Sequence, residues 1–73
     1  MSPRFPSLTP KKIIKILEHN GFSLDHTSGS HYVFYNAASG RRIVIPYHSK
    51  DLPRGTLMAI VKQSGLSIAL FQS

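Results

Sequence analysis

Histidine and basic side chains dominate the residues of this sequence that could do chemistry. The 73 residues include nine Lys and Arg but only three carboxylates, Glu18, Asp25 and Asp51, which are scattered along the chain. The histidines are His19, His26, His31 and His48. No two of them have the spacing that places metal ligands on one helix face, and no carboxylate cluster accompanies them. We therefore expect no metal ion, no other cofactor and no paired-carboxylate mechanism.

Histidine combined with basic side chains is sufficient to cleave RNA. The ribose 2′-OH attacks the adjacent phosphate when a base removes its proton, and a general acid protonates the departing 5′-oxygen. Histidine, with an ordinary pKa of about 6.5, can take either role near neutral pH. Lys and Arg stabilise the charge of the phosphorane-like transition state. DNA lacks the 2′-OH, so the chemistry itself selects RNA.

His31 is the candidate catalytic residue. It follows Gly29 and Ser30, two small residues that leave the approach to its ring open, and it begins the aromatic and β-branched run 31–35. Such a run favours a strand, which would hold His31 at the start of rigid backbone near the surface. A single histidine in a strand is more often a packing or surface residue, so the assignment needs support from the rest of the chain.

Other histidines and aromatic residues are weaker candidates for a catalytic or RNA-binding role. His48 follows the third predicted strand, where a supporting catalytic role and an ordinary loop hydrogen bond are equally well founded. His19 belongs to a solvated helix face and His26 to a strand, and neither is assigned a role in the site. Tyr35 and Tyr47 are the aromatic side chains best placed to stack on bases.

The charge of the chain indicates an anionic partner. A net charge of +6 on so small a body favours nucleic acid, an acidic protein or an anionic membrane surface. Solubility alone is the simpler explanation, but it accounts poorly for so large an imbalance. Arg41 and Arg42 alternate between faces of a strand, so only one can share the face of His31. The candidate RNA-binding side chains are Lys11, Lys12, Lys15, Arg41, Arg42, Lys50 and Arg54.

A first helix is predicted over residues 10–20. Thr9 suits the N-cap and Pro10 the first helical position, where a missing N–H costs nothing. Gly21 can adopt the left-handed conformation that ends a helix. At about 100° per residue the apolar side comprises Ile13, Ile14, Ile16 and Leu17.

Three strands are predicted over 22–26, 31–35 and 41–46. Alternation points Phe22 and Leu24 of the first strand inward. The short connections 27–29 and 36–40, each with a glycine, favour an antiparallel meander. Pro46 cannot donate a hydrogen bond to the sheet and should end the third strand.

A second helix is predicted over 56–64, with Gly65 as its end. An alternative start places Gly55 or Pro53 in its first turn. Its apolar stripe comprises Leu57, Met58, Ile60 and Val61. A last short turn over 68–71 should pack its apolar residues on the core.

The order helix–strand–strand–strand–helix predicts a two-layer α+β fold. Both helices have a one-sided apolar stripe, so both should cover one face of a three-stranded antiparallel sheet. Residues 1–8 are expected to form an extended arm and residues 9–73 a single domain. The chain has no cysteine, no signal-like apolar segment at its N-terminus and no apolar run of membrane-spanning length. We expect a soluble, cytoplasmic protein.

The chain also resembles a known family, the HicA toxins, from Leu8 to Phe71. The matching segments are Leu8–Leu17, Asn20–Phe22, Gly29–His31, Val44–Pro46 with His48, Leu52–Leu57 and Gln63–Ser67. The resemblance implies a fold like that of a double-stranded-RNA-binding domain (dsRBD). It further implies a ribosome-independent mRNA endonuclease that is toxic when free and is neutralised by a cognate HicB antitoxin.

The catalytic histidine of the family lies in its Gly-Ser-His motif, which corresponds to His31. The family often has a second histidine directly after it, where this chain has Tyr32. The family also continues with acidic residues after Leu-Ser, where this chain has the apolar segment Ile68–Phe71.

Two functions fit the sequence. The first is a metal-independent endoribonuclease that acts on mRNA or other single-stranded RNA through His31 and is covered by its antitoxin. The second is a non-catalytic RNA-binding or protein-interaction module with the same fold, which the basic charge alone would also explain.

Overall fold

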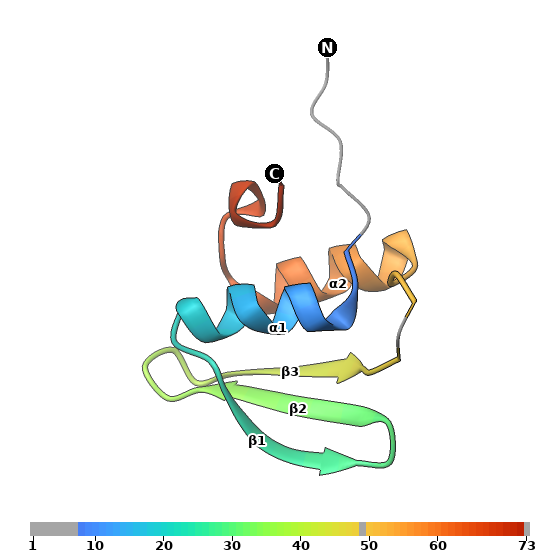
Figure 1. Cartoon of the computed structure of the whole chain (residues 1–73). Coiled ribbons are helices and arrows are strands. Elements are labelled where there is room, and N and C mark those ends of the chain that lie inside the picture. The colour runs from blue at the N-terminus through green and yellow to red at the C-terminus, as the bar shows by residue number, and fades with distance from the viewer. Residues whose placement is uncertain (1–7, 49, 73) are drawn as a thin grey trace.

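The computed structural model describes residues 8–48 and 50–72 (Figure 1). The elements are α1 (Pro10–His19), β1 (Ser23–Ser28), β2 (His31–Asn36), β3 (Arg41–Pro46), α2 (Arg54–Ser64) and the 3-10 helix η1 (Ile68–Phe71). The strands form one antiparallel sheet in the order β1-β2-β3. Both long helices lie on the same side of this sheet (Figure 1). The predicted two-layer α+β fold is confirmed.

The N-terminal side of the fold begins with a buried residue. The predicted arm lies outside the described residues except for Leu8, which is buried and accepts a hydrogen bond from the backbone N–H of Leu52 at 3.0 Å. Thr9 caps α1 as predicted, its hydroxyl oxygen accepting from the N–H of Lys12 at 3.3 Å. The helix ends at His19, one residue before the predicted end. Among the described residues, no helix is both long and apolar enough to cross a membrane.

The core lies between the helices and one face of the sheet. Its largest fully buried side chains are Ile13, Leu17, Phe34, Ile43, Ile45, Ile60 and Phe71, with Pro10 at the start of α1. Phe34 of β2 pairs with Ile43 of β3, so both point toward the helices. Because side chains alternate along a strand, His31, Val33 and Tyr35 of β2 point the other way. We call the side of the sheet away from the helices the open face.

A two-residue turn joins β1 to β2 and differs from the predicted connection. The turn was predicted over 27–29, but β1 continues to Ser28 and the turn consists of Gly29 and Ser30. Gly29 has a φ of 58° and Ser30 has no positive φ, the pattern of a type II′ turn, whose twist matches that of the strands. Both strands can therefore pair up to the turn itself, with Ser28 opposite His31.

Four apolar residues that were expected in the core are partly exposed. Leu24 pairs with Phe34 and points toward the helix side, but 47% of it is exposed because β1 is the edge strand. In α2, Met58 is 41% exposed because the stripe facing the sheet is narrower than predicted. In η1 only Phe71 is buried, while Ile68 and Leu70 stay exposed, since one side of a single turn faces the core. The helix α2 starts at Arg54, directly after Pro53, so the alternative start with Gly55 in the first turn is the correct one.

Candidate functional site

His31 is the first residue of the central strand and is exposed to solvent. It lies between Ser28 of β1 and Pro46 of β3. Just beyond this row, the N–H of Tyr47 donates to the carbonyl oxygen of Ser30 at 2.6 Å. The backbone that carries His31 is therefore held from both sides. The prediction that His31 lies at the start of a strand, near the surface, is confirmed.

Gly29 contributes its backbone conformation to this site. Its φ of 58° is in the left-handed region, which residues with a Cβ rarely adopt. A Cβ placed on Gly29 would meet nothing within 4 Å, so crowding is not the reason for glycine here. Glycine allows the tight turn, and the empty surroundings leave the approach to His31 open.

A bulge in β1 gathers a polar cluster that the sequence did not reveal. Leu24 pairs with Phe34 and His26 pairs with Val33, so Asp25 is an extra residue between them. A bulge redirects side chains locally. Here it lets the consecutive residues Asp25 and His26 both lie on the same face of the sheet. His26 lies on the open face with Val33, and the Asp25 carboxylate reaches its ring.

The cluster is held by the carboxylate of Asp25. Oδ2 of Asp25 lies 2.7 Å from Nδ1 of His26 and accepts a hydrogen bond from Nη1 of Arg42 at 3.0 Å. The guanidinium of Arg42 also lies over the ring of Tyr35, 4.9 Å from its centroid. The cluster therefore joins β1 to β3 across the central strand. We call Asp25, His26, Tyr35 and Arg42 the open-face cluster.

The surroundings of Asp25 favour its ionised form. The hydrogen bond with His26, and then that from Arg42, lower the pKa of Asp25 from its ordinary value of 3.8. Because the carboxylate is exposed, water screens these interactions and their effect on stability is small.

A pH dependence of stability follows. The pKa of Asp25 is lower in the folded chain than in the unfolded chain. Its ionised carboxylate therefore stabilises the fold at pH values above the unfolded-state pKa. This stabilisation is lost as the pH falls through the folded-state pKa. We expect Asp25→Asn to lower the free energy of unfolding slightly near neutral pH. The difference from wild type should shrink below a pH of about 4. Urea unfolding of both proteins at neutral pH and below a pH of about 4 measures it, and a difference that did not shrink at the lower pH would contradict the assignment.

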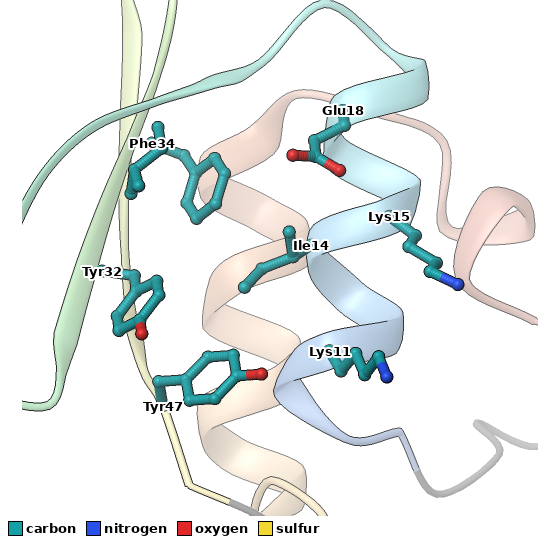
Figure 2. A pocket seen from close by; sticks show the side chains of 8 residues that line it. Lys11, Ile14, Lys15, Glu18, Tyr32, Phe34 and Tyr47 are labelled. Atoms are coloured by element: carbon teal, nitrogen blue, oxygen red, sulfur yellow. The ribbon is translucent and has the colours of Figure 1, made fainter.

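A groove lies on the other side of the sheet, between α1 and the first two strands (Figure 2). Its volume is about 280 Å³, and its lining comprises Lys11, Ile14, Lys15 and Glu18 of α1 with Leu24, Tyr32, Phe34 and Tyr47. The rings of Tyr32 and Tyr47 stack with centroids 4.5 Å apart and planes at 18°. A neighbouring hollow of about 290 Å³ shares Lys11 and Tyr47 and adds Thr9 and His48. Together they form an apolar, aromatic floor with lysines at its edge.

Some of the predicted site residues lie at the groove and its neighbouring hollow, and others lie on the open face of the sheet. His48, Lys11 and Lys15 line the groove or its neighbouring hollow, whereas His31 lines neither. As predicted, only one of the two arginines shares the face of His31. This is Arg42, whereas Nη1 of Arg41 donates to the carbonyl oxygen of Gln63 at 3.2 Å, near the end of α2. The remaining predicted basic residues, Lys12, Lys50 and Arg54, are exposed and line neither hollow.

Comparison with known proteins assigns the chain to a family. A search of curated proteins found no match. A family model described as "HicA toxin of bacterial toxin-antitoxin" matches residues 10–66, which include both long helices and all three strands. Proteins of this family are toxins of toxin–antitoxin pairs, generally ones that cleave mRNA, so an RNA substrate and a cognate antitoxin are implied in general. The chain belongs to the HicA toxin family.

Proposed function

We propose that this toxin is a metal-independent endoribonuclease in which His31 transfers a proton during cleavage of mRNA. The observation that carries the proposal is the position of His31, which is exposed, preceded by an unhindered Gly-Ser turn, and fixed on backbone paired on both sides. A general base or acid must reach its proton at hydrogen-bond distance, so a rigid and accessible ring is what this chemistry requires.

The reaction needs two proton transfers. A base takes the proton of the ribose 2′-OH, whose oxygen forms a new bond to the adjacent phosphorus. The bond between phosphorus and the 5′-oxygen breaks, and an acid gives that oxygen a proton. The products are a 2′,3′-cyclic phosphate and a 5′-OH, with no net consumption of water. Two protonatable side chains with suitable pKa values are sufficient, so a metal ion is not required.

The groove beside α1 is suited to hold the RNA strand next to the reacting phosphate. Lys11 and Lys15 supply positive charge at its edge, and Tyr47 offers an aromatic ring to a base. The groove and His31 lie on opposite faces of the sheet, and the RNA strand would pass from one to the other around the end where Tyr47 follows Pro46, the residue that pairs with His31. His48, in the adjoining hollow, is in a position to contact a phosphate there.

The antitoxin is proposed to be of the HicB type and to cover His31. A chain with a net charge of +6 favours an acidic partner, whose association would be fast and sensitive to salt. Coverage of an exposed catalytic ring by a protein partner would exclude RNA without altering the ring itself.

The proposal is tested with a synthetic RNA and its 2′-deoxy counterpart. Cut sites are first mapped on a long mRNA, and a short RNA around one site is then made with and without a single 2′-OH at the cleaved position. With excess chelator, we expect the purified protein to cut the first oligonucleotide and leave the second intact. The new ends should be a cyclic phosphate and a 5′-OH, as read by mass spectrometry.

Four outcomes would contradict the proposal. Cleavage of the deoxy oligonucleotide, or new ends with a 5′-phosphate, would exclude attack by the 2′-OH. Loss of activity in chelator would exclude a metal-independent reaction. Binding of RNA without any cleavage would favour the non-catalytic binding module instead.

A further inference from the structure

The cleavage reaction needs a second proton-transfer group, and the open face carries one. His26 and His31 lie on neighbouring strands, where His26 pairs with Val33 and His31 is two residues before Val33. They are therefore diagonal neighbours on the same face of the sheet. Positions related in this way lie about 7–8 Å apart, within reach of long or aromatic side chains. Two rings at this spacing can stand on either side of one phosphate.

The bulge in β1 is what makes this arrangement. Without the extra residue, consecutive side chains of a strand would point to opposite faces, and Asp25 and His26 would be separated by the sheet. With the bulge, the carboxylate and the imidazole meet at 2.7 Å on the open face. Bulges are over-represented at sheet edges, such as β1, and next to active sites, where they redirect a side chain.

Asp25 orients the ring of His26. With Nδ1 of His26 engaged by Oδ2 of Asp25, the proton on Nδ1 is directed to the carboxylate, and Nε2 is the nitrogen left to face a substrate. Arg42 binds the same oxygen at 3.0 Å and keeps Asp25 in place. His26 is thus positioned to hold a proton and to donate it from Nε2.

We propose that His26 is the general acid of the reaction, with His31 as the general base and Asp25 as the residue that positions His26. This inference rests on the proposed ribonuclease function. His31 removes the 2′-OH proton as the new oxygen–phosphorus bond forms. His26 gives its Nε2 proton to the 5′-oxygen as the old bond breaks. The two histidines then exchange a proton with water and return to their starting states.

A sulfur-substituted substrate separates the two roles. When sulfur replaces the bridging 5′-oxygen, the leaving group is a thiolate, which departs without being protonated. On ordinary RNA we expect His26→Ala to slow cleavage by about 10²–10⁴-fold, the usual contribution of a general acid. On the sulfur-substituted RNA the same variant should lose less than about tenfold. His31→Ala should be slow on both substrates, because the 2′-OH still needs a base.

Controls distinguish a catalytic role from a structural one. Thr27→Ala changes the neighbouring residue of β1, which does not belong to the open-face cluster, and should cleave both substrates like wild type. Asp25→Asn should show the pattern of His26→Ala with a smaller loss, because the ring remains but is less well oriented. A variant that merely disturbs the strand would slow both substrates equally.

The outcomes separate this inference from the proposed function. Equal losses for His26→Ala on both substrates, or full activity on ordinary RNA, would overturn the assignment of His26 while leaving the ribonuclease proposal intact. If the wild-type protein cuts neither substrate, the ribonuclease proposal fails and the roles of both histidines fail with it. A loss confined to ordinary RNA supports the assignment.

Discussion

Replacement of His31 by alanine should reduce the rate of RNA cleavage by about 10²–10⁴-fold. The ring is the exposed group of the Gly-Ser-His segment, and its removal would take away the base that we propose for the 2′-OH. The fold should be retained, because His31 is exposed and its side chain contributes nothing to the core. Single-turnover cleavage of a labelled RNA in excess chelator, with wild type and variant compared at equal concentration, measures the effect.

Two controls make this result specific. His19→Ala removes another exposed histidine, at the end of α1, and should leave the cleavage rate unchanged. Free imidazole in the buffer should restore part of the activity of His31→Ala, because the approach beside Gly29 is unhindered. A His31→Ala protein that cleaves at the wild-type rate would remove this residue from the mechanism and would point to a contaminating nuclease or to another base.

The elements that could be predicted are those with local signals. Thr9 and Pro10 mark the start of α1 by capping chemistry, and the structure shows the predicted cap hydrogen bond. The third strand, rich in β-branched residues and ended by Pro46, has the predicted bounds. Gly65 ends α2 in the left-handed conformation with a φ of 70°. In each case the residues that determine the boundary of the element lie within a few positions of that boundary.

The candidate site could be predicted only in part, because the open-face cluster depends on the register between the strands. His31 is recognisable from its own neighbours, Gly29 and Ser30. The link between Asp25, His26 and Arg42 arises only when a bulge shifts β1 by one residue and β2 brings the two outer strands together. In a regular strand, the consecutive residues Asp25 and His26 would point to opposite faces. The sequence therefore contained no local sign that their side chains are in contact.

The groove was missed for a similar reason. Leu24 was expected to be buried by simple alternation, but burial also requires an element above it. The helices cover the sheet at Phe34, which is 2% exposed, and leave Leu24 of the edge strand 47% exposed. The relative placement of a helix and an edge strand is a tertiary property. The stacked pair of Tyr32 and Tyr47 likewise brings together residues from β2 and from the segment after β3.

Truncation of Phe34 should have the largest effect on stability. Phe34 lies in the central strand, is only 2% exposed and belongs to the core between sheet and helices. Replacing a buried phenylalanine by alanine removes its burial and leaves a cavity, at a cost of about 3–5 kcal/mol. A domain of 73 residues has a total stability of about 4–11 kcal/mol. Phe34→Ala should therefore unfold at a much lower urea concentration, or be unfolded without urea.

A matched variant on the opposite face tests the reason for this loss. Val44 lies in β3 on the open face and is 47% exposed, so Val44→Ala should cost less than about 1 kcal/mol. Urea midpoints with an unchanged slope report the difference. Equal midpoints for the two variants would mean that the core does not lie on the helix side of the sheet. Any loss of RNA cleavage by Phe34→Ala should follow its unfolded fraction and diminish on cooling toward the temperature of greatest stability, whereas the loss caused by His31→Ala should persist in fully folded protein.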